Sequence, residues 1–121
     1  MKKKGYIVKN IEEAITVPCP CGESTRIIQY TDTPVANLHV THIMDSTKHY
    51  HKECTEYYYI LEGKGFMELG NDVVELRPGT TIVIEPGTPH RGYGDFKAII
   101  VGIPAWKHTD EFFCEEKGEN E

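Results

Sequence analysis

One stretch of the sequence decides the fold: residues 49–63 read HYHKECTEYYYILEG. His49 and His51 lie two residues apart, and on a β-strand this spacing points both imidazoles to the same face of the sheet. The four residues that follow are enough for a short turn, after which the chain resumes as a strand that starts with Glu56. The sequence therefore predicts a hairpin that returns the Glu56 carboxylate to the side of the two imidazoles.

The tyrosine run after Glu56 should alternate between the two faces of its strand. If Glu56 faces inward, period two places Tyr58 and Ile60 inward and leaves Tyr57 and Tyr59 on the outer face. Tyr58 is then the candidate catalytic residue, because its phenol could reach a substrate or a metal-bound water. The alternative is that Tyr58 only packs in a strand that favours aromatic residues.

A second segment, residues 79–90, ends in a histidine behind a turn rich in Pro and Gly. Such a turn can aim His90 back at the first three side chains. Three imidazoles and one carboxylate suit a divalent first-row metal and leave room for water or substrate. We expect one ion of iron, manganese, nickel or cobalt, with zinc or copper possible, since a closed structural zinc site more often contains cysteines. The expected ligands are His49, His51, Glu56 and His90.

The rest of the chain predicts an all-β domain. Glycine and proline recur through the middle of the sequence, and the segments between them are rich in Val, Ile, Thr and Tyr, which is typical of an antiparallel sandwich or barrel. Gly70-Asn71 predicts a tight hairpin turn, and Asn10 to Glu13 predicts a single helical turn with a capping box. The expected strands are 27–30, 36–44, 56–61, 65–69, 72–76, 81–84 and 98–103.

Length and charge limit the possible classes of function. The chain has 121 residues with 13 basic and 19 acidic side chains, a net charge of −6, which disfavours a nucleic-acid or anionic-membrane partner. We expect one domain over residues 1–121, with a barrel core at about 25–104, an N-terminal arm at 1–24 and a C-terminal tail at 105–121 that frays in its acidic last part. No export signal or long apolar run is present, so we expect a cytoplasmic protein.

The four cysteines are expected to be reduced thiols without a disulfide framework. Cys19-Pro20-Cys21 is the pair closest to a metal or redox motif. Its spacing is not C-x-x-C, and no second Cys/His pair follows at zinc-finger distance. We therefore assign no site to it.

Two runs closely resemble the two signature motifs of the cupin superfamily: His49-x-His51-x4-Glu56-x6-Gly63 and Gly79-x5-Glu85-x-Gly87-x2-His90. They occur in the expected order, fifteen residues apart. The resemblance covers about residues 36–103 and implies a double-stranded β-helix, the jelly-roll barrel of antiparallel strands. It also implies that the four residues named above are the metal ligands. Ile43 and Glu85 stand where the family commonly has glycine and proline, but neither is a ligand.

The resemblance implies a metal-dependent enzyme of oxygenase, isomerase, epimerase or lyase type that acts on a small polar or carboxylate-bearing molecule. The alternative is a module that binds or senses a small ligand or the metal without turnover. A homodimer is also expected to be possible, through an outer surface that includes Tyr57 and Tyr59.

The other histidines, His39, His42 and His108, are expected to be structural or exposed. His42 alternates with apolar residues on its strand, which predicts that it faces inward and could orient a metal ligand. These neighbours are Leu38, Val40 and Met44.

Two further residues, Arg91 and Trp106, have expected positions relative to the barrel. Arg91 should point away from His90 by alternation. Trp106 should close one end of the barrel, or belong to a lid over residues 106–113.

Overall fold

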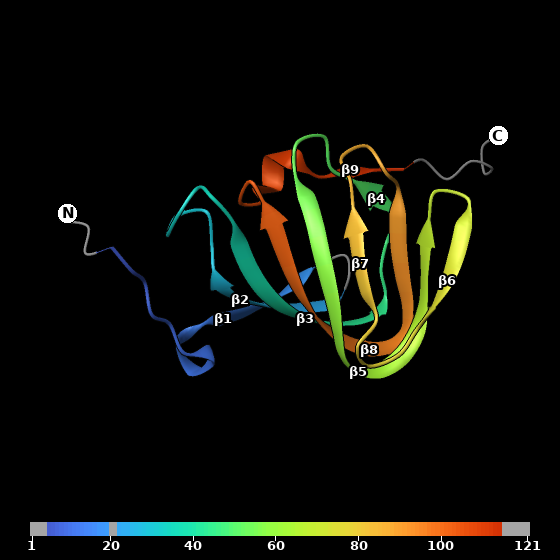
Figure 1. The fold of residues 1–121 in the computed structure, drawn as a ribbon, viewed down its shortest axis with the longest axis horizontal. Helices are drawn as coiled ribbons and strands as arrows, with labels where there is room; N and C mark the ends of the chain where they lie inside the picture. The colour runs from blue at the N-terminus through green and yellow to red at the C-terminus, as the bar shows by residue number, and fades with distance from the viewer. Residues whose placement is uncertain (1–4, 20–21, 115–121) are drawn as a thin grey trace.

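The computed structural model of the protein describes residues 5–19 and 22–114 (Figure 1). Within these residues it contains nine β-strands and two short 3-10 helices, and no helix has the length and apolar character needed to span a bilayer. The helices are η1 (Ile11–Glu13) and η2 (His108–Asp110). The strands are β1 (Ile15–Cys19), β2 (Gly22–Ile28), β3 (Asn37–Asp45), β4 (His49–Tyr50), β5 (Thr55–Leu69), β6 (Asp72–Leu76), β7 (Thr81–Ile84), β8 (His90–Ile103) and β9 (Phe112–Phe113).

All strand pairs are antiparallel, and the sheet curls into a barrel (Figure 1). Strand β8 is the centre of the topology, because it pairs with β3 and β4 on one side and with β5 along its whole length on the other. Strand β5 also pairs with β6 and β7, while β2 and β1 extend the sheet beyond β3. The predicted all-β jelly-roll of antiparallel strands is confirmed.

Two predicted strands, 56–61 and 65–69, form one long strand, β5. The pairing of β5 with β8 shifts register between Ile60 and Glu62, which lets the strand bend without ending. Gly63 follows this bulge with a φ of 88°, and a Cβ there would lie 2.2 Å from the backbone oxygen of Asp95. Glycine is therefore required at this bend by both its backbone angle and the closeness of β8.

The other differences from the predicted strands lie in polar segments. The prediction 98–103 covers only the second half of β8, because the first half contains glycines and charges and no apolar run. Strand β1 and most of β2 were not predicted for the same reason, since they contain proline, cysteine and several polar residues. Pairing with β3 and with each other fixes these segments as strands despite their composition.

The predicted turns are present with differences in detail. Gly70-Asn71 joins β5 to β6, since Leu69 pairs with Asp72, but of the two turn residues only Gly70 has a positive φ. Helix η1 follows Asn10 as expected. The capping box does not form: the Asn10 side chain makes no capping bond to the backbone and instead donates to the Glu13 carboxylate at 3.4 Å.

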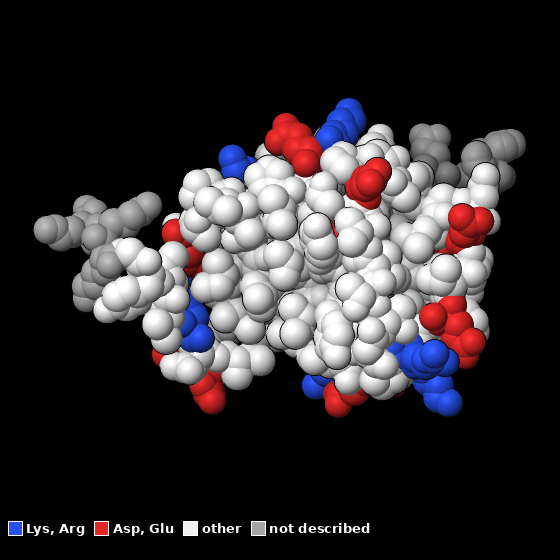
Figure 2. All heavy atoms as spheres, viewed as in Figure 1, with Lys and Arg blue, Asp and Glu red and all other residues white. Residues whose placement is uncertain are grey.

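The apolar core and the outer face of β5 follow the predicted alternation. Tyr58 and Ile60 are 4% and 0% exposed, whereas Tyr57 and Tyr59 are 44% and 46% exposed. The core consists of Ile43, Tyr58, Ile60, Met67, Leu76, Ile84, Phe96, Ala98 and Ile100. On the face shown in Figure 2, which includes β5 and β7, charged side chains lie mainly around the edge.

The predicted inner face of β3 is wrong. The buried residues are Asn37, His39, Thr41 and Ile43, and the alternate set with His42 lies on the outer face. The His42 Nε2 lies 2.7 Å from a carboxylate oxygen of exposed Asp95, so His42 does not orient a metal ligand. The physical reason is that this part of the barrel interior is a polar cavity, and the polar residues of the strand therefore face inward.

The expectation of four reduced cysteines is wrong at Cys19, which is disulfide-bonded. Cys54 and Cys114 are free thiols as predicted. An export signal bears on the redox state of the compartment, but whether two cysteines can form a disulfide also depends on the distance and orientation of their side chains. Cys21 and the acidic tail 115–121 lie outside the described residues.

Candidate metal centre

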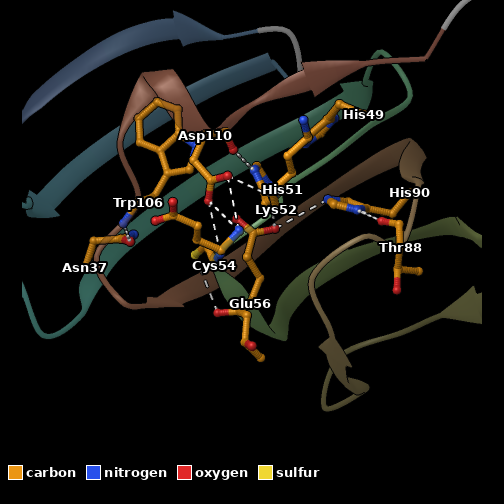
Figure 3. A network of polar contacts seen from close by, with 12 residues as sticks. Asn37, His49, His51, Lys52, Cys54, Glu56, Thr88, His90, Trp106 and Asp110 are labelled. Atoms are coloured by element: carbon orange, nitrogen blue, oxygen red, sulfur yellow. Dashed lines mark hydrogen bonds and ion pairs between the residues drawn. The ribbon is translucent and has the colours of Figure 1, made fainter.

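Three histidines converge at one end of the barrel, where the short strand β4 meets the start of β8. His49 and His90 are directly paired across these strands, and their ring centroids are 4.4 Å apart. His51 follows β4 immediately, with its ring 5.1 Å from that of His49 and 5.5 Å from that of His90. All three side chains are buried, and Figure 3 shows them together with Glu56.

The turn before His90 is hydrogen-bonded to the segment that contains His49 and His51. The Gly87 N–H donates to the carbonyl oxygen of His51 at 2.7 Å, and Gly87 itself adopts a φ of 85°. This bond places the end of the turn beside β4. It explains how a single histidine distant in sequence is aimed at the predicted hairpin.

Each of the three imidazoles is oriented by a backbone carbonyl. The Nδ1 atoms lie 2.7, 2.7 and 2.9 Å from carbonyl oxygens, which can only accept a hydrogen bond, so each Nδ1 bears a proton. The other ring nitrogen, Nε2, is therefore the one available to a metal. The pairs are His49 with Thr47, His51 with Asp110, and His90 with Thr88.

Glu56 completes the cluster from β5. Its Oε1 atom lies 3.4 Å from the Nε2 of His51 and 3.4 Å from the Nε2 of His90. These three atoms are buried, and none has a hydrogen-bond partner within the described part of the chain. Two ligands held at about 2.1 Å by one ion lie about 3.0–3.4 Å apart, so the spacing fits a shared metal ion.

The three imidazoles could hold the ion even without Glu56, because their ligand atoms all lie within 4.8 Å of one another. The set is nitrogen-rich and contains no thiolate, which suits borderline divalent metals. The residues present therefore fit a first-row transition metal.

The electrostatics keep the Glu56 carboxylate ionised in this buried cluster. Burial alone would raise the pKa of Glu56, but the contacts with His51 and His90 outweigh it and lower that pKa. Burial alone would lower the pKa of His51, but the adjacent Glu56 carboxylate raises it to about 9. Burial, helped by the charge of His90, lowers the pKa of His49 to about 4. A metal cation would displace the His51 proton and bind the same atoms.

A cavity of about 290 Å³ opens beside the cluster and is lined by His49, His51, Glu56 and Tyr58. The Tyr58 ring centroid is 6.4 Å from that of His90. The Tyr58 hydroxyl makes no hydrogen bond with any residue in the described ranges. Burial, and then the nearby Glu56 charge, raise the pKa of Tyr58 well above 10, so the phenol stays neutral. It can therefore donate a hydrogen bond into the cavity.

The sequence did not predict most of the remaining cavity wall. The inner faces of β2 and β3 are polar. Polar residues alternate along both strands, and this pattern would have indicated a polar inner face. The apolar positions were instead assigned to the inside. Trp106 also lines the cavity, with its backbone N–H bound to the Asn37 side-chain oxygen at 2.7 Å. The unpredicted lining residues include Ser24, Arg26, Asn37, His39, Thr41, His108, Glu111 and Phe113.

A strap formed by residues 105–114 crosses the mouth of the barrel and reaches β9, which pairs with β4 (Figure 1). Asp110 anchors it: its carboxylate accepts from the backbone N–H groups of Lys52, Glu53 and Cys54 at 2.8–3.2 Å. The Asp110 carbonyl oxygen accepts from His51, so the strap also orients a predicted ligand. No local pattern in the sequence could have identified this role.

Arg91 points away from the cluster, as predicted. Its guanidinium pairs with Asp45 at 2.8 Å and with Glu68 at 2.9 Å on the outer surface. Arg91 therefore has no contact with the cavity.

Comparison with known proteins agrees with this geometry. A family model described as a cupin domain matches residues 40–101, a range that contains the three histidines and Glu56. An uncharacterized protein of Methanocaldococcus jannaschii, MJ1618, is 43% identical over 67 residues, a match that covers 52% of this chain and 52% of that protein. The chain thus matches about half the length of this curated relative.

Three solved structures illustrate the likeness in fold. A protein from Planctomyces limnophilus has a TM-score of 0.85 and 27% identity, over 91% of this chain and 98% of that one. Pac13, a nucleoside dehydratase from Streptomyces, has a TM-score of 0.82 and 18% identity, over 91% and 92%. Ectoine synthase from P. lautus has a TM-score of 0.75 and 19% identity, over 93% and 95%. Together with the family match, the barrel and its two motifs show that the chain belongs to the cupin superfamily.

Proposed function

We propose that this cupin is a metal-dependent enzyme that acts on a small polar or carboxylate-bearing molecule in the barrel cavity. One observation supports this most strongly: the Nε2 atoms of His51 and His90 and the Oε1 atom of Glu56 converge in a buried place without hydrogen-bond partners among the described residues. The proposed ligands are His49, His51, Glu56 and His90. Iron, manganese, nickel or cobalt is favoured, and zinc or copper is possible.

A bound divalent ion would supply a Lewis acid or, if redox-active, a centre for oxygen chemistry. The chain itself would contribute orientation and a proton donor. The carbonyl oxygens behind the histidines fix which nitrogen faces the ion. The neutral Tyr58 phenol would donate a hydrogen bond to a substrate oxygen in the cavity. The reaction would be of oxygenase, isomerase, epimerase or lyase type, and the presence of a dehydratase and a synthase among proteins of the same fold supports catalysis.

Thermal unfolding with added metal ions tests the site. An ion that binds only the folded protein raises the melting temperature. We expect Ni²⁺, Mn²⁺ or Co²⁺ to stabilise the chelator-treated wild type and the surface variant His42→Ala, but not His51→Ala. Equal stabilisation of all three proteins would contradict the proposal.

Screening then separates enzyme from binding module. After anaerobic loading with iron(II), oxygen uptake with carboxylates, thiols and catechols tests the oxygenase type, and product analysis with the other metals tests isomerase and lyase types. We expect turnover that disappears in His51→Ala. A compound that raises the melting temperature and is recovered unchanged would instead identify a module that binds small ligands.

We also propose self-association through the outer surface of β5 and β7. Tyr57, Tyr59, Leu61 and Val83 are each between 42% and 51% exposed there, and neighbouring exposed apolar side chains can form an interaction surface. Sedimentation of the wild type should show a dimer, and Tyr59→Lys should shift it toward the monomer. An unchanged distribution in Tyr59→Lys would exclude this face.

A further inference from the structure

The cavity contains a cation that the metal centre does not use, Arg26 on β2. Arg26 lies directly opposite His39 on β3 and shares the inner face of β2 with buried Ser24. Its Nε atom is buried without a hydrogen-bond partner, and no ion pair of its guanidinium occurs within residues 5–19 and 22–114. A half-buried guanidinium in this state lacks the acceptors that such groups normally have in proteins.

Neither of the two carboxylates that line the cavity forms an ion pair with Arg26. Glu56 is engaged with His51 and His90. Glu111 also lines the cavity and is near enough for its charge to interact with that of Arg26, but the two side chains form no ion pair, and burial raises the pKa of Glu111. His39 is neutral near pH 7, because burial and then the charge of Arg26 lower its pKa to about 4. The Arg26 guanidinium is therefore open to an acceptor that enters the cavity from outside.

Arg26 is held in a fixed orientation. Its Cζ atom lies 5.0 Å from the centroid of the Trp106 ring, which packs against the guanidinium. The indole is in turn held by the bond from the Trp106 backbone N–H to Asn37, and its ring meets that of His39 edge to face. A guanidinium fixed in this way presents paired N–H donors, which match the oxygens of a carboxylate or a phosphate.

The arginine and the metal centre open into the same cavity. In Figure 3, Trp106 and Asn37 lie on one side and His90 on the other, with His51 and Glu56 between them. The cavity volume of about 290 Å³ is at the small end of the range for ligand pockets, so one small molecule would fill it. Such a molecule would meet both Arg26 and the metal centre.

We propose that Arg26 binds the anionic group, a carboxylate or a phosphate, of a small molecule whose other end lies at the metal centre. The placement of the other end of the molecule at the metal centre rests on the proposed function, but the anion site at Arg26 does not. The molecule would therefore be a small carboxylic acid or phosphate ester, with a metal-binding or reactive group at the end opposite its anionic group.

The test is anion binding to chelator-treated protein. Acetate, malonate, succinate and inorganic phosphate are titrated separately, and binding is followed by calorimetry and by the fluorescence of Trp106, the sole tryptophan of the chain. We expect at least one anion to bind the wild type and to bind Arg26→Gln roughly 10–100-fold more weakly, since a bond to a charged group is lost. Arg91→Gln, which removes a surface arginine outside the cavity, should bind like the wild type. The response to the carboxylates or to phosphate identifies which group is recognised.

Two results would overturn the proposal: no anion binds the wild type up to tens of millimolar, or Arg26→Gln binds as tightly as the wild type. Arg26→Lys is the second variant, should the glutamine variant fail to fold; it keeps the charge but not the paired donors, and it should bind at least several-fold more weakly. His51→Ala separates this proposal from the proposed function. It should keep anion binding that depends on Arg26 even when it no longer binds a metal.

Discussion

Replacing Asp110 by alanine should destabilise the fold and weaken metal binding together. The Asp110 carboxylate accepts from three consecutive backbone N–H groups in the turn between β4 and β5, while its carbonyl oxygen accepts from the Nδ1 of His51. The variant removes the anchor that joins the C-terminal strap to this turn. The carbonyl that accepts from the His51 imidazole is still present in the variant, but its position is no longer fixed.

The magnitude follows from which of the three donors water can reach. A hydrogen bond to a charged group contributes about 1.5–3 kcal/mol. The N–H groups of Lys52 and Glu53 belong to exposed residues, so water replaces most of their loss, whereas Cys54 is only 2% exposed. Counting the Cys54 bond fully and the others in part gives roughly 2–4 kcal/mol of lost unfolding free energy. The carbonyl of residue 110 that orients His51 remains in the variant but is no longer held in place, so we expect metal affinity to fall by about 10-fold, the lower end of the effect of losing an orienting group.

Two assays measure these effects. Urea unfolding of the metal-free protein gives the change in stability, and competition with a chelator gives the metal affinity. Asp95→Ala is the matched control, because Asp95 pairs with His42 on the outer surface and its side chain is 70% exposed; such a pair contributes about 0–1 kcal/mol. If Asp110→Ala behaves like Asp95→Ala in both assays, the assigned role of the strap is wrong.

Three further changes have defined outcomes. The pKa of His39 is about 6.5 in the unfolded chain and about 4 in the folded protein. Above pH 6.5 the residue is neutral in both states and does not reduce stability. Between pH 6.5 and pH 4 only the unfolded chain binds the proton, so the free energy of unfolding falls as the pH falls. The metal-free wild type should therefore lose about 2 kcal/mol more than His39→Gln between pH 7 and pH 5, and equal losses in urea unfolding would exclude this. Tyr58→Phe should keep full metal content and lose about a hundredfold in turnover of the substrate that the screen identifies; unchanged kcat would mean that Tyr58 only packs. Gly63→Ala should cost roughly 3 kcal/mol of unfolding free energy because a Cβ meets the Asp95 backbone, against about 1 kcal/mol for Gly70→Ala, where no atom of the described residues lies within 4 Å.

The residues of the proposed metal site could be predicted because most of them are close in sequence. His49, His51 and Glu56 belong to one turn and its flanking strands, and strand periodicity sets their faces directly. His90 is distant, but its Pro-Gly turn is tied to the His51 carbonyl by a single backbone bond. Short-range geometry was therefore enough for His49, His51 and Glu56, whereas His90 was placed by its Pro-Gly turn and by the resemblance to the second cupin motif.

The polar wall of the cavity could not be predicted in the same way. Period-two alternation identifies two faces of a strand but not which face lies inside. On β3 the apolar set was taken as the inner one, yet His39 and Asn37 face inward because the interior there is a cavity and not a packed core. For the same reason, strand alternation did not predict that Arg26 on β2 lines the cavity.

The role of the strap could not be predicted from the sequence for a different reason. Asp110 binds a turn more than fifty residues earlier in the chain, through its carboxylate and its carbonyl. Neither bond depends on a sequence pattern around Asp110. Contacts of this kind are set by tertiary packing and become visible only in the folded chain.

The metal content of the purified protein tests the central claim most directly. The wild type, His51→Ala, His90→Ala and the surface variant His42→Ala are purified without chelator and analysed for first-row metals per chain. The proposed site predicts about one divalent ion per chain in the wild type and in His42→Ala, and loss of that ion in His51→Ala and His90→Ala. Full retention of metal in both His51→Ala and His90→Ala would contradict it.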